Sequence, residues 1–185
     1  MARSNQVRII GGQWRSRRIS FPDHEGLRPS ADRVRETLFN WLGQDLDGRT
    51  CLDLFAGSGA LGFEALSRGA ASVVMVEKSR SACAALRRNA ELLGAKNLQL
   101  RCADALEFAT AAAADAAARF DVVFLDPPFA SGLLAQVLPL TVPLLRPDAR
   151  VYVESAAAFA PADGWKVLRH GHAGQVHYTL VTYGD

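Results

Sequence analysis

The chain has 185 residues, of which 49% are hydrophobic and 22% are charged, and its formal net charge is +2. This is ordinary globular composition, so bulk disorder, a coiled coil and a collagen-like fold are excluded. The length predicts one domain with at most a small extension. No apolar run approaches the roughly 20 residues of a membrane-spanning helix, and the polar, basic N-terminus is unlike a secretory signal, so we expect neither.

The positive charge is concentrated at the front of the chain. The first 20 residues hold five arginines and no acidic residue, and further arginines follow closely. A basic arm of this kind is typical of a surface that contacts an anionic polymer, and the alternative is a solvated basic tail. The candidate contact residues are Arg8, Arg15, Arg17, Arg18, Arg33 and Arg35. Trp14, which lies among them, is expected to pack internally, with stacking on RNA as the alternative.

Residues 1–45 form this basic front segment, which we expect to be an extension of a main domain at 46–185. Residues 7–10 and 18–21 are strand-like and lie either side of turn-forming glycines, which predicts a β-hairpin. Ser30 has the character of a helix N-cap, and apolar residues at helical spacing predict a helix over residues 31–43.

From residue 49 onward, short apolar runs alternate with helical patterns. Strands are predicted at 50–55, 72–77, 97–102, 120–125 and 150–154, and helices at 60–68, 79–93, 105–118 and 133–145. Two final strands, 165–170 and 176–183, are expected to be joined by a turn over residues 170–174. Near-continuous apolar strands are typical of a parallel sheet that is buried on both faces. The sequence therefore predicts an α/β fold: a doubly wound, mostly parallel seven-stranded sheet with a short N-terminal hairpin and helix.

The three cysteines, Cys51, Cys83 and Cys102, are widely spaced and form no CxxC pair. We therefore expect neither a disulfide framework nor a zinc site, and we expect a reducing, cytoplasmic setting. Cys51 and Cys102 fall in predicted buried strands and are expected to be core residues. His170 and His172 lack an obvious third ligand nearby, so no metal site is predicted and both are expected at the surface.

Residues 53–62, DLFAGSGALG, follow the first strand of the main domain and open a helix. The glycines permit a tight turn and the close approach of a ligand. Their GxGxxG spacing fits a dinucleotide site, and Glu77, about 20 residues further on, suits the ribose of either a dinucleotide or S-adenosylmethionine. Asp53 favours S-adenosylmethionine, because a carboxylate repels a pyrophosphate and attracts an amino group. Asp104, after the third strand, offers an acceptor for the adenine amino group, and helix capping is the alternative.

The strand at 120–125 is followed by Asp126, Pro127, Pro128 and Phe129, at the edge where open α/β sheets bind their ligands. An exocyclic amine of a base is a poor nucleophile, because its lone pair is delocalised into the ring. The Asp126 carboxylate and a backbone carbonyl near Pro127 are well placed to hold both N–H groups of such an amine, and Phe129 offers a face for stacking. Methyl transfer from a sulfonium would then be an in-line displacement on an unpaired or flipped nucleotide. The loop contains no cysteine, which disfavours a cytosine-C5 methyltransferase.

These motifs resemble those of class I S-adenosylmethionine-dependent methyltransferases. The segments RIIGGQWR at 8–15 and RPSADRVRETLFNWL at 28–42 are similar, more narrowly, to the bacterial family that methylates the N2 amine of a guanine in 16S rRNA. That family usually has Thr where this chain has Ser30, a change that keeps the hydroxyl group. The resemblance implies a substrate that is 16S rRNA within an assembled or assembling 30S subunit.

The resemblance also implies roles for individual residues. It assigns catalysis to Asp126, Pro127, Pro128 and Phe129. It assigns cofactor binding to Asp53, Phe55, Ala56, Gly57, Ser58, Gly59 and Glu77, with Arg28, Ser30 and the helix that follows them as a cover. We expect Lys78, Asp104 and Ala105 to contact the cofactor as well.

Other functions stay open at this point. The DPPF tetrad alone does not separate guanine from adenine, so an adenine-N6 or other exocyclic-amine methyltransferase on RNA or DNA is the main alternative. A protein glutamine methyltransferase is disfavoured, because its tetrad usually begins with Asn. A silent RNA-binding domain is disfavoured because Asp53, Glu77 and Asp126 are all present. We expect a monomer, since no repeat or heptad indicates otherwise.

Overall fold

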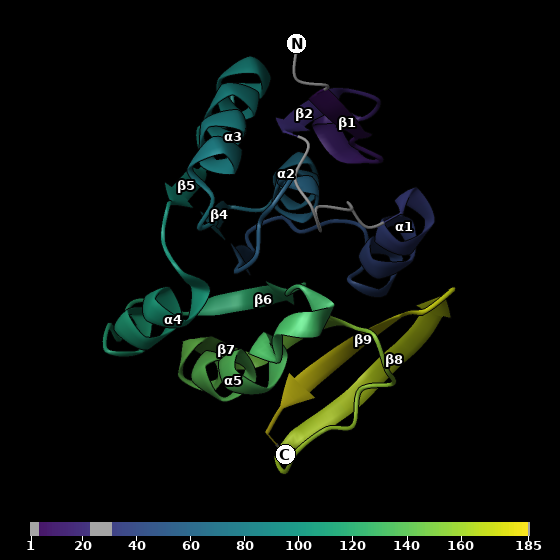
Figure 1. Ribbon diagram of the computed structural model, residues 1–185, viewed down its shortest axis with the longest axis vertical. Coiled ribbons are helices and arrows are strands. Elements are labelled where there is room, and N and C mark those ends of the chain that lie inside the picture. The colour runs from purple at the N-terminus through teal and green to yellow at the C-terminus, as the bar shows by residue number, and fades with distance from the viewer. Residues whose placement is uncertain (1–3, 23–30, 185) are drawn as a thin grey trace.

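The computed structural model describes residues 4–22 and 31–184 of the chain. Its centre is a seven-stranded sheet with the strand order β5-β4-β3-β6-β7-β9-β8, and a separate two-stranded hairpin, β1-β2, precedes it (Figure 1). The pairs among β3 to β7 are parallel, whereas β9 runs antiparallel to both β7 and β8. The predicted doubly wound, mostly parallel sheet with an N-terminal hairpin is therefore confirmed.

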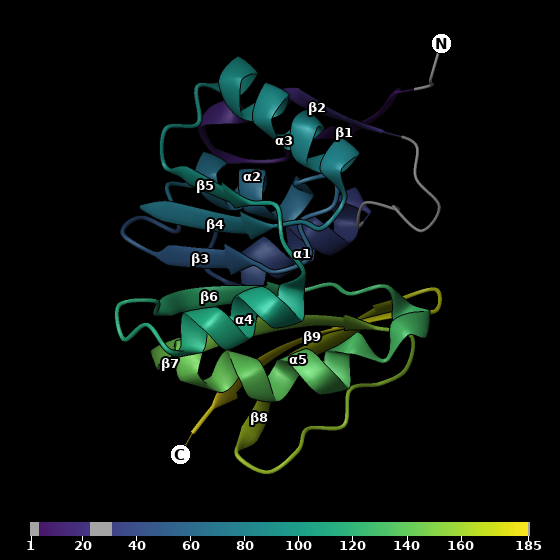
Figure 2. The ribbon, with the colours of Figure 1, turned by 60° about the vertical axis from the view of Figure 1, so that its left-hand side comes forward.

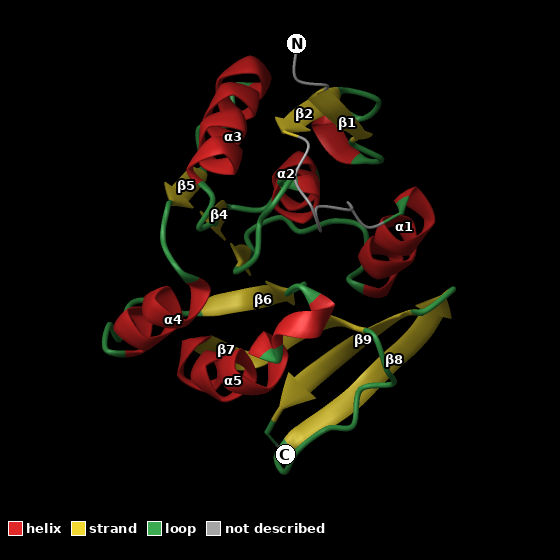
Figure 3. Ribbon diagram, in the orientation of Figure 1, coloured by secondary structure: helices red, strands yellow, loops and turns green. Residues whose placement is uncertain are grey.

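Figure 3 shows the alternation of strands and helices along the chain. The strands are β1 Ser4–Arg8, β2 Arg18–Pro22, β3 Thr50–Asp53, β4 Ser72–Val76, β5 Leu98–Arg101, β6 Phe120–Leu125, β7 Leu145–Ser155, β8 Trp165–Ala173 and β9 Val176–Tyr183. The α-helices are α1 Asp32–Trp41, α2 Ala60–Ser67, α3 Arg80–Leu93, α4 Ala105–Ala113 and α5 Leu133–Thr141. Short 3-10 helices are η1 Gly12–Trp14, η2 Phe129–Ser131 and η3 Val142–Leu144.

The central strands are apolar on both faces because helices cover both. In β6, Val122 and Phe124 join one hydrophobic cluster, with the hairpin, α1, α2 and α3. Val123 and Leu125 point to the opposite face, as the pleat requires, and join a second cluster with residues of α4 and α5. Figure 2 shows α4 and α5 beside β6 and β7. The first face matters for function, because the front segment is folded onto it.

The front segment packs onto the main sheet and shares its core. Ile9 and Ile19 are each 1% exposed and lie in the same cluster as residues of α2 and α3. The side chain of Asn89, on α3, accepts from the backbone N–H of Ser20 at 3.1 Å and donates to its carbonyl at 2.8 Å. Trp14 is 7% exposed, so its packing role is confirmed and stacking on RNA is not.

Helix α1 confirms the predicted helix at 31–43 with slightly closer bounds. Its apolar stripe, Val34, Leu38 and Phe39, is buried against the sheet. The residue at its N-cap is Ala31, which makes no side-chain capping bond. The expected capping residue, Ser30, lies outside the described residues, as does Arg28.

Several predicted elements are wrong at their ends. The helix predicted at 133–145 ends at Thr141 and is followed by η3, and β7 begins at Leu145 instead of residue 150. Helix α4 stops at Ala113 instead of residue 118, and the Asp115 carboxylate then accepts from the N–H of Ala117 at 2.9 Å in a turn. Strand β8 continues to Ala173, so the predicted turn over residues 170–174 is wrong. Gly171 lies within β8, opposite Tyr178. This strand position requires glycine, because a Cβ there would stand 2.5 Å from the Tyr178 ring. No helix in the described part of the chain is long and apolar enough to cross a membrane.

Candidate active site

A cavity of about 1020 Å³ lies at the carboxyl ends of the parallel strands, around the point where the strand order reverses between β3 and β6. Open α/β sheets bind their ligands at this position. The segments that follow β3, β4, β5 and β6 line the cavity, together with the start of α1, the end of β7 and the tip of the β8-β9 hairpin. Most of the predicted site residues line it: Asp53, Phe55, Ala56, Gly57, Ser58, Glu77, Lys78, Asp104, Ala105, Asp126, Pro127, Pro128 and Phe129.

The loop after β3 turns sharply into α2. Gly57 and Gly59 adopt φ angles of 52° and 82°, in the left-handed region that favours glycine. A Cβ at Gly59 would lie 2.5 Å from Leu86 and 2.7 Å from Phe63, so this position also requires close packing. Gly59 is thus a shaping residue of the loop and does not itself line the cavity.

Asp53 is the most buried of the predicted cofactor acids, with 1% exposure. Its Oδ2 accepts from the N–H of Gly62 at 3.1 Å, while Oδ1 is buried and has no hydrogen-bond partner within the described part of the chain. Burial raises the pKa of the Asp53 carboxyl to about 7, and the charge of Glu77 acts in the same direction. Because a buried acceptor is normally satisfied, the bare Oδ1 indicates a missing donor, such as an ammonium group.

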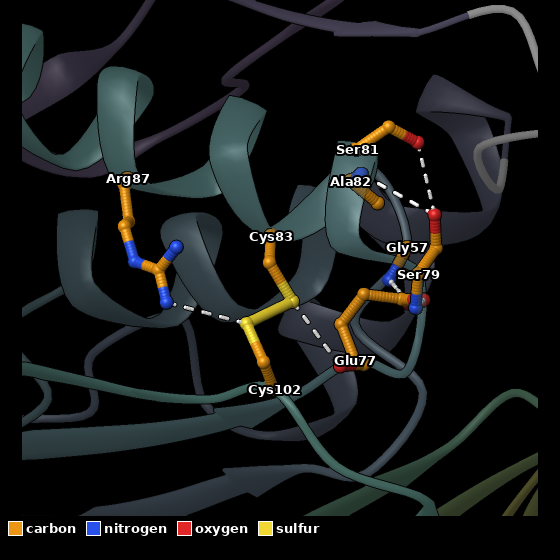
Figure 4. Close-up of a disulfide and its surroundings, with 8 residues drawn as sticks. All are labelled: Gly57, Glu77, Ser79, Ser81, Ala82, Cys83, Arg87 and Cys102. Carbon is orange, nitrogen blue, oxygen red and sulfur yellow. Dashed lines mark hydrogen bonds between the residues drawn. A yellow bond between two sulfur atoms is a disulfide. The ribbon is translucent and has the colours of Figure 1, made fainter.

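Glu77 joins two loops at the end of β4 (Figure 4). Its Oε2 accepts from the N–H of Gly57 at 2.9 Å and its Oε1 from the N–H of Ser79 at 2.7 Å. A carboxylate has about four lone-pair positions, so both oxygens can still accept from the two hydroxyls of a ribose. Asp104 caps α4 through Oδ1, at 2.8 Å from the N–H of Leu106, and also lines the cavity. Both the capping and the ligand interpretation of Asp104 are thus compatible with its position.

A disulfide joins Cys83, on α3, to Cys102, just after β5 (Figure 4). The expectation that the chain has no disulfide is therefore wrong, because the packing of α3 against β5 brings together two residues that are 19 apart in the sequence. Cys102 is also exposed instead of buried, because β5 ends at Arg101. Cys51 is fully buried as expected, and burial raises the pKa of its thiol to about 12.

Asp126 is paired with a second acid that sequence reasoning missed, Glu154 near the end of β7. Glu154 is 4% exposed and lines the same cavity. Its Oε1 accepts from the hydroxyl of Tyr152 at 2.7 Å. Burial raises the pKa of Asp126 well above its ordinary value, and the charge of Glu154 and a hydrogen bond to it act in the same direction. The signal for Glu154 was present in the sequence: it is an acid at the carboxyl edge of a predicted strand, as Asp53 is.

The loop after Asp126 is shaped by its prolines. Pro127 is buried, and Pro128 precedes the 3-10 helix η2. The carbonyl of Pro128 accepts from the N–H of Ser131 at 3.1 Å and from its hydroxyl. Phe129 is 47% exposed at the cavity, an unusual position for a large apolar side chain.

The arginines of the front segment divide into two groups. Those in the first group are exposed: Arg8, Arg15, Arg17, Arg18 and Arg33. Arg35 is 1% exposed, so its predicted contact with RNA is wrong. Its guanidinium is paired internally, with Asp32 at 2.6 Å and Glu64 at 3.3 Å. Burial lowers the pKa of Arg35, and the two carboxylates oppose that effect.

His170 and His172 are exposed on β8 and share a face with His177 of β9. His170 Nε2 lies 3.2 Å from His177 Nδ1, and the two rings are stacked. Sequence reasoning missed His177 as their neighbour because the strand that became β8 was predicted to end at residue 170, before His172 could pair with His177. Among the described residues, no group of three or more metal-ligating side chains is gathered.

The fold and the acid-lined cavity are those of a class I methyltransferase. A model of the family described as Conserved hypothetical protein 95 matches residues 7–182, and the chain belongs to this family. The predicted methyltransferase class is confirmed by relatives that carry this name.

Relatives extend over nearly the whole chain. Ribosomal RNA small subunit methyltransferase D of Escherichia coli (strain K12) is 45% identical over 183 residues, which cover 96% of this chain and 90% of that protein. The protein of the same name from Haemophilus influenzae is 40% identical over 179 residues, covering 95% of this chain and 93% of its own length. The solved structure of the Escherichia coli protein yhhF is 43% identical and superposes with a TM-score of 0.86, covering 98% of this chain and 99% of that chain.

Proposed function

We propose that this protein transfers a methyl group from S-adenosylmethionine to the exocyclic N2 amine of a guanine in 16S rRNA. The names of its relatives specify small-subunit ribosomal RNA, which supports an RNA substrate. The observation that carries the proposal is that Asp126 lines the same cavity as Asp53 and Glu77. An amine held by Asp126 therefore lies beside a cofactor held by the other two acids.

The residues of the cavity fit S-adenosylmethionine, which supplies a methyl group activated by a positively charged sulfur. The bare Oδ1 of Asp53 suits the amino group of the methionine moiety, and the Glu77 carboxylate suits the ribose hydroxyls. Asp104 and Ala105 are the proposed contacts to adenine. Lys78, exposed at the rim, completes the set of residues after β4.

The protein's part in the reaction is to hold the amine and to take its proton. Asp126 accepts a hydrogen bond from N2–H, which draws the lone pair of N2 away from the ring. N2 then bonds to the methyl carbon as the carbon–sulfur bond breaks, and that electron pair stays on sulfur. The proton that N2 loses passes to the Asp126 carboxylate, which acts as the general base.

Phe129 gives the target base a surface inside the cavity. A base within a helix cannot reach Asp126, so the nucleotide must be unpaired or flipped. The exposed ring of Phe129 then stacks on the base, and the rigid Pro127-Pro128 segment keeps that ring in place. Positioning of this kind supplies much of the rate when the methyl donor is already activated.

The front segment, residues 1–45, is the proposed cover and RNA-binding surface. Val34 of α1 and its N-cap residue Ala31 line the cavity, and Arg28 and Ser30 come just before them in the sequence. The exposed arginines are the proposed phosphate contacts: Arg8, Arg15, Arg17, Arg18 and Arg33. We propose that the enzyme acts as a monomer, in the cytoplasm, on an assembled or assembling 30S subunit.

A comparison of substrates tests this function. Radiolabelled S-adenosylmethionine is incubated with the enzyme and unmethylated 30S subunits, naked 16S rRNA or duplex DNA in parallel. Label in the RNA of the 30S subunit is the expected result. Label in DNA alone would contradict the RNA substrate and favour the alternative, an exocyclic-amine methyltransferase acting on DNA.

A further inference from the structure

Among the described residues that line the cavity, Glu154 is an acid that neither cofactor binding nor methyl transfer uses. Strands β6 and β7 pair in parallel with Leu125 opposite Val153. Asp126 and Glu154 are the next residues along these strands, so their side chains point to the same face of the sheet. This places two carboxyl groups side by side in the wall where Asp126 would hold the target amine.

The surroundings of Glu154 are built to fix it as a hydrogen-bond acceptor. The side chain is 4% exposed, yet it lines the cavity. The Tyr152 hydroxyl, itself buried, donates to Glu154 Oε1 at 2.7 Å. Asp126 lines the same cavity, and the charge of Glu154 contributes to the raised pKa of the Asp126 carboxyl. A carboxylate has about four lone-pair positions, so Glu154 can accept from a ligand in the cavity as well as from Tyr152.

The Watson–Crick edge of guanine supplies such donors. It presents N1–H beside the N2 amine, so two neighbouring acceptors match it. Adenine presents its N6 amine beside a bare N1, which is an acceptor and would face the carboxylate lone pairs without a hydrogen. The two bases therefore differ at the one atom next to the methylated amine.

We propose that Glu154 accepts the hydrogen bond of guanine N1–H while Asp126 accepts that of N2–H, and that Glu154 thereby selects guanine over adenine. Tyr152 is a positioning residue that holds the Glu154 carboxylate in place. This inference rests on the proposed function. It assigns the choice between guanine and adenine to Glu154, because the DPPF tetrad alone does not separate the two bases.

The test compares two target nucleotides in reconstituted 30S subunits: guanosine and the 2-aminopurine ribonucleoside. The latter keeps the C2 amine but has no N1–H. The wild-type enzyme should prefer guanosine in kcat/KM by about 10- to 100-fold, since a buried acceptor is left unpaired by the analogue. Glu154→Gln replaces one carboxylate oxygen with an NH2 donor, which suits a bare N1, so this preference should fall at least about tenfold.

Matched measurements separate this effect from misfolding. Glu107→Gln, an exposed position on α4, makes the same chemical change outside the cavity and should keep the wild-type preference. Calorimetric binding of S-adenosylhomocysteine should be the same in Glu154→Gln and in the wild type. Tyr152→Phe should lower the preference for guanosine in part, because the carboxylate loses its fixed orientation.

If Glu154→Gln keeps the wild-type ratio of kcat/KM for guanosine over the 2-aminopurine ribonucleoside, the inference is overturned. This includes the case in which activity falls equally on both nucleotides. The proposed function is tested separately by the wild-type enzyme alone. If it methylates guanosine at N2 but Glu154→Gln keeps the ratio, only the inference fails. If the wild type methylates another base, the proposed function itself fails.

Discussion

The clearest structural prediction concerns Glu64, a carboxylate of α2 that is fully buried. It accepts from the backbone N–H groups of Ile10 and Gly11, at 2.9 Å and 2.8 Å. It also pairs with Arg35 at 3.3 Å and with Arg68 at 2.9 Å. This one side chain thus ties the hairpin, α1 and α2 together, and Glu64→Ala removes all four contacts.

The expected loss follows from the burial of the partners. Removing one member of a buried ion pair costs about 3–5 kcal/mol, because the other charge stays buried and unpaired. Arg35 keeps its contact with the half-exposed Asp32, which sets the expectation near the middle of that range, about 4 kcal/mol. For a chain of this length, this corresponds to a fall in Tm of about 8–16 °C. Glu64→Gln keeps the shape and one acceptor oxygen, so its loss should be smaller.

Urea unfolding, followed by circular dichroism, measures these losses directly. Glu36→Ala is the matched control, because Glu36 is exposed on α1, and its free energy of unfolding should stay within about 0.5 kcal/mol of the wild type. A loss below about 1 kcal/mol for Glu64→Ala would refute the reasoning, since it would mean that the four contacts do not hold the front segment.

Three further predictions concern the cofactor, the reaction and RNA. The affinity for S-adenosylmethionine should fall as the pH falls through about 7, because protonation removes the Asp53 charge that attracts the amino group. In calorimetry, 5′-methylthioadenosine, which lacks the amino group, should show no such fall. Equal pH dependence of the two affinities would contradict this role of Asp53. Asp126→Asn should lower kcat by about 100- to 1000-fold with unchanged binding of S-adenosylhomocysteine, because the amide cannot take the N2 proton, and near-normal turnover would exclude the proposed mechanism. Replacing the exposed Arg15, Arg17 and Arg18 by Glu should weaken RNA binding and make its salt dependence shallower, since fewer counterions are released. An unchanged slope would mean that these arginines do not contact RNA.

The parts of the site that sequence reasoning found are those with a local signal. Asp53, Glu77 and Asp104 each lie at or just after the end of a predicted strand, so their place at the carboxyl edge of a parallel sheet follows from strand order. Their contacts, such as that of Glu77 with Gly57, join loops that glycine already marks. Asp126 was predictable for the same reason.

The parts that were missed depend on contacts between distant segments. Arg35 looks like a surface arginine until α2 brings Glu64 against it from 29 residues away. Cys83 and Cys102 become neighbours only when α3 packs beside β5. Gly171 suggests a turn until the ring of Tyr178 is seen to need the space. Periodicity and spacing carry no information about such pairs.

The identity of the methylated nucleoside is the most direct test of the account. RNA from 30S subunits treated with enzyme and S-adenosylmethionine would be digested to nucleosides and analysed by mass spectrometry. We expect N2-methylguanosine from the 16S rRNA. N6-methyladenosine in its place would contradict both the proposed function and the role given to Glu154, while leaving the fold and the cofactor site intact.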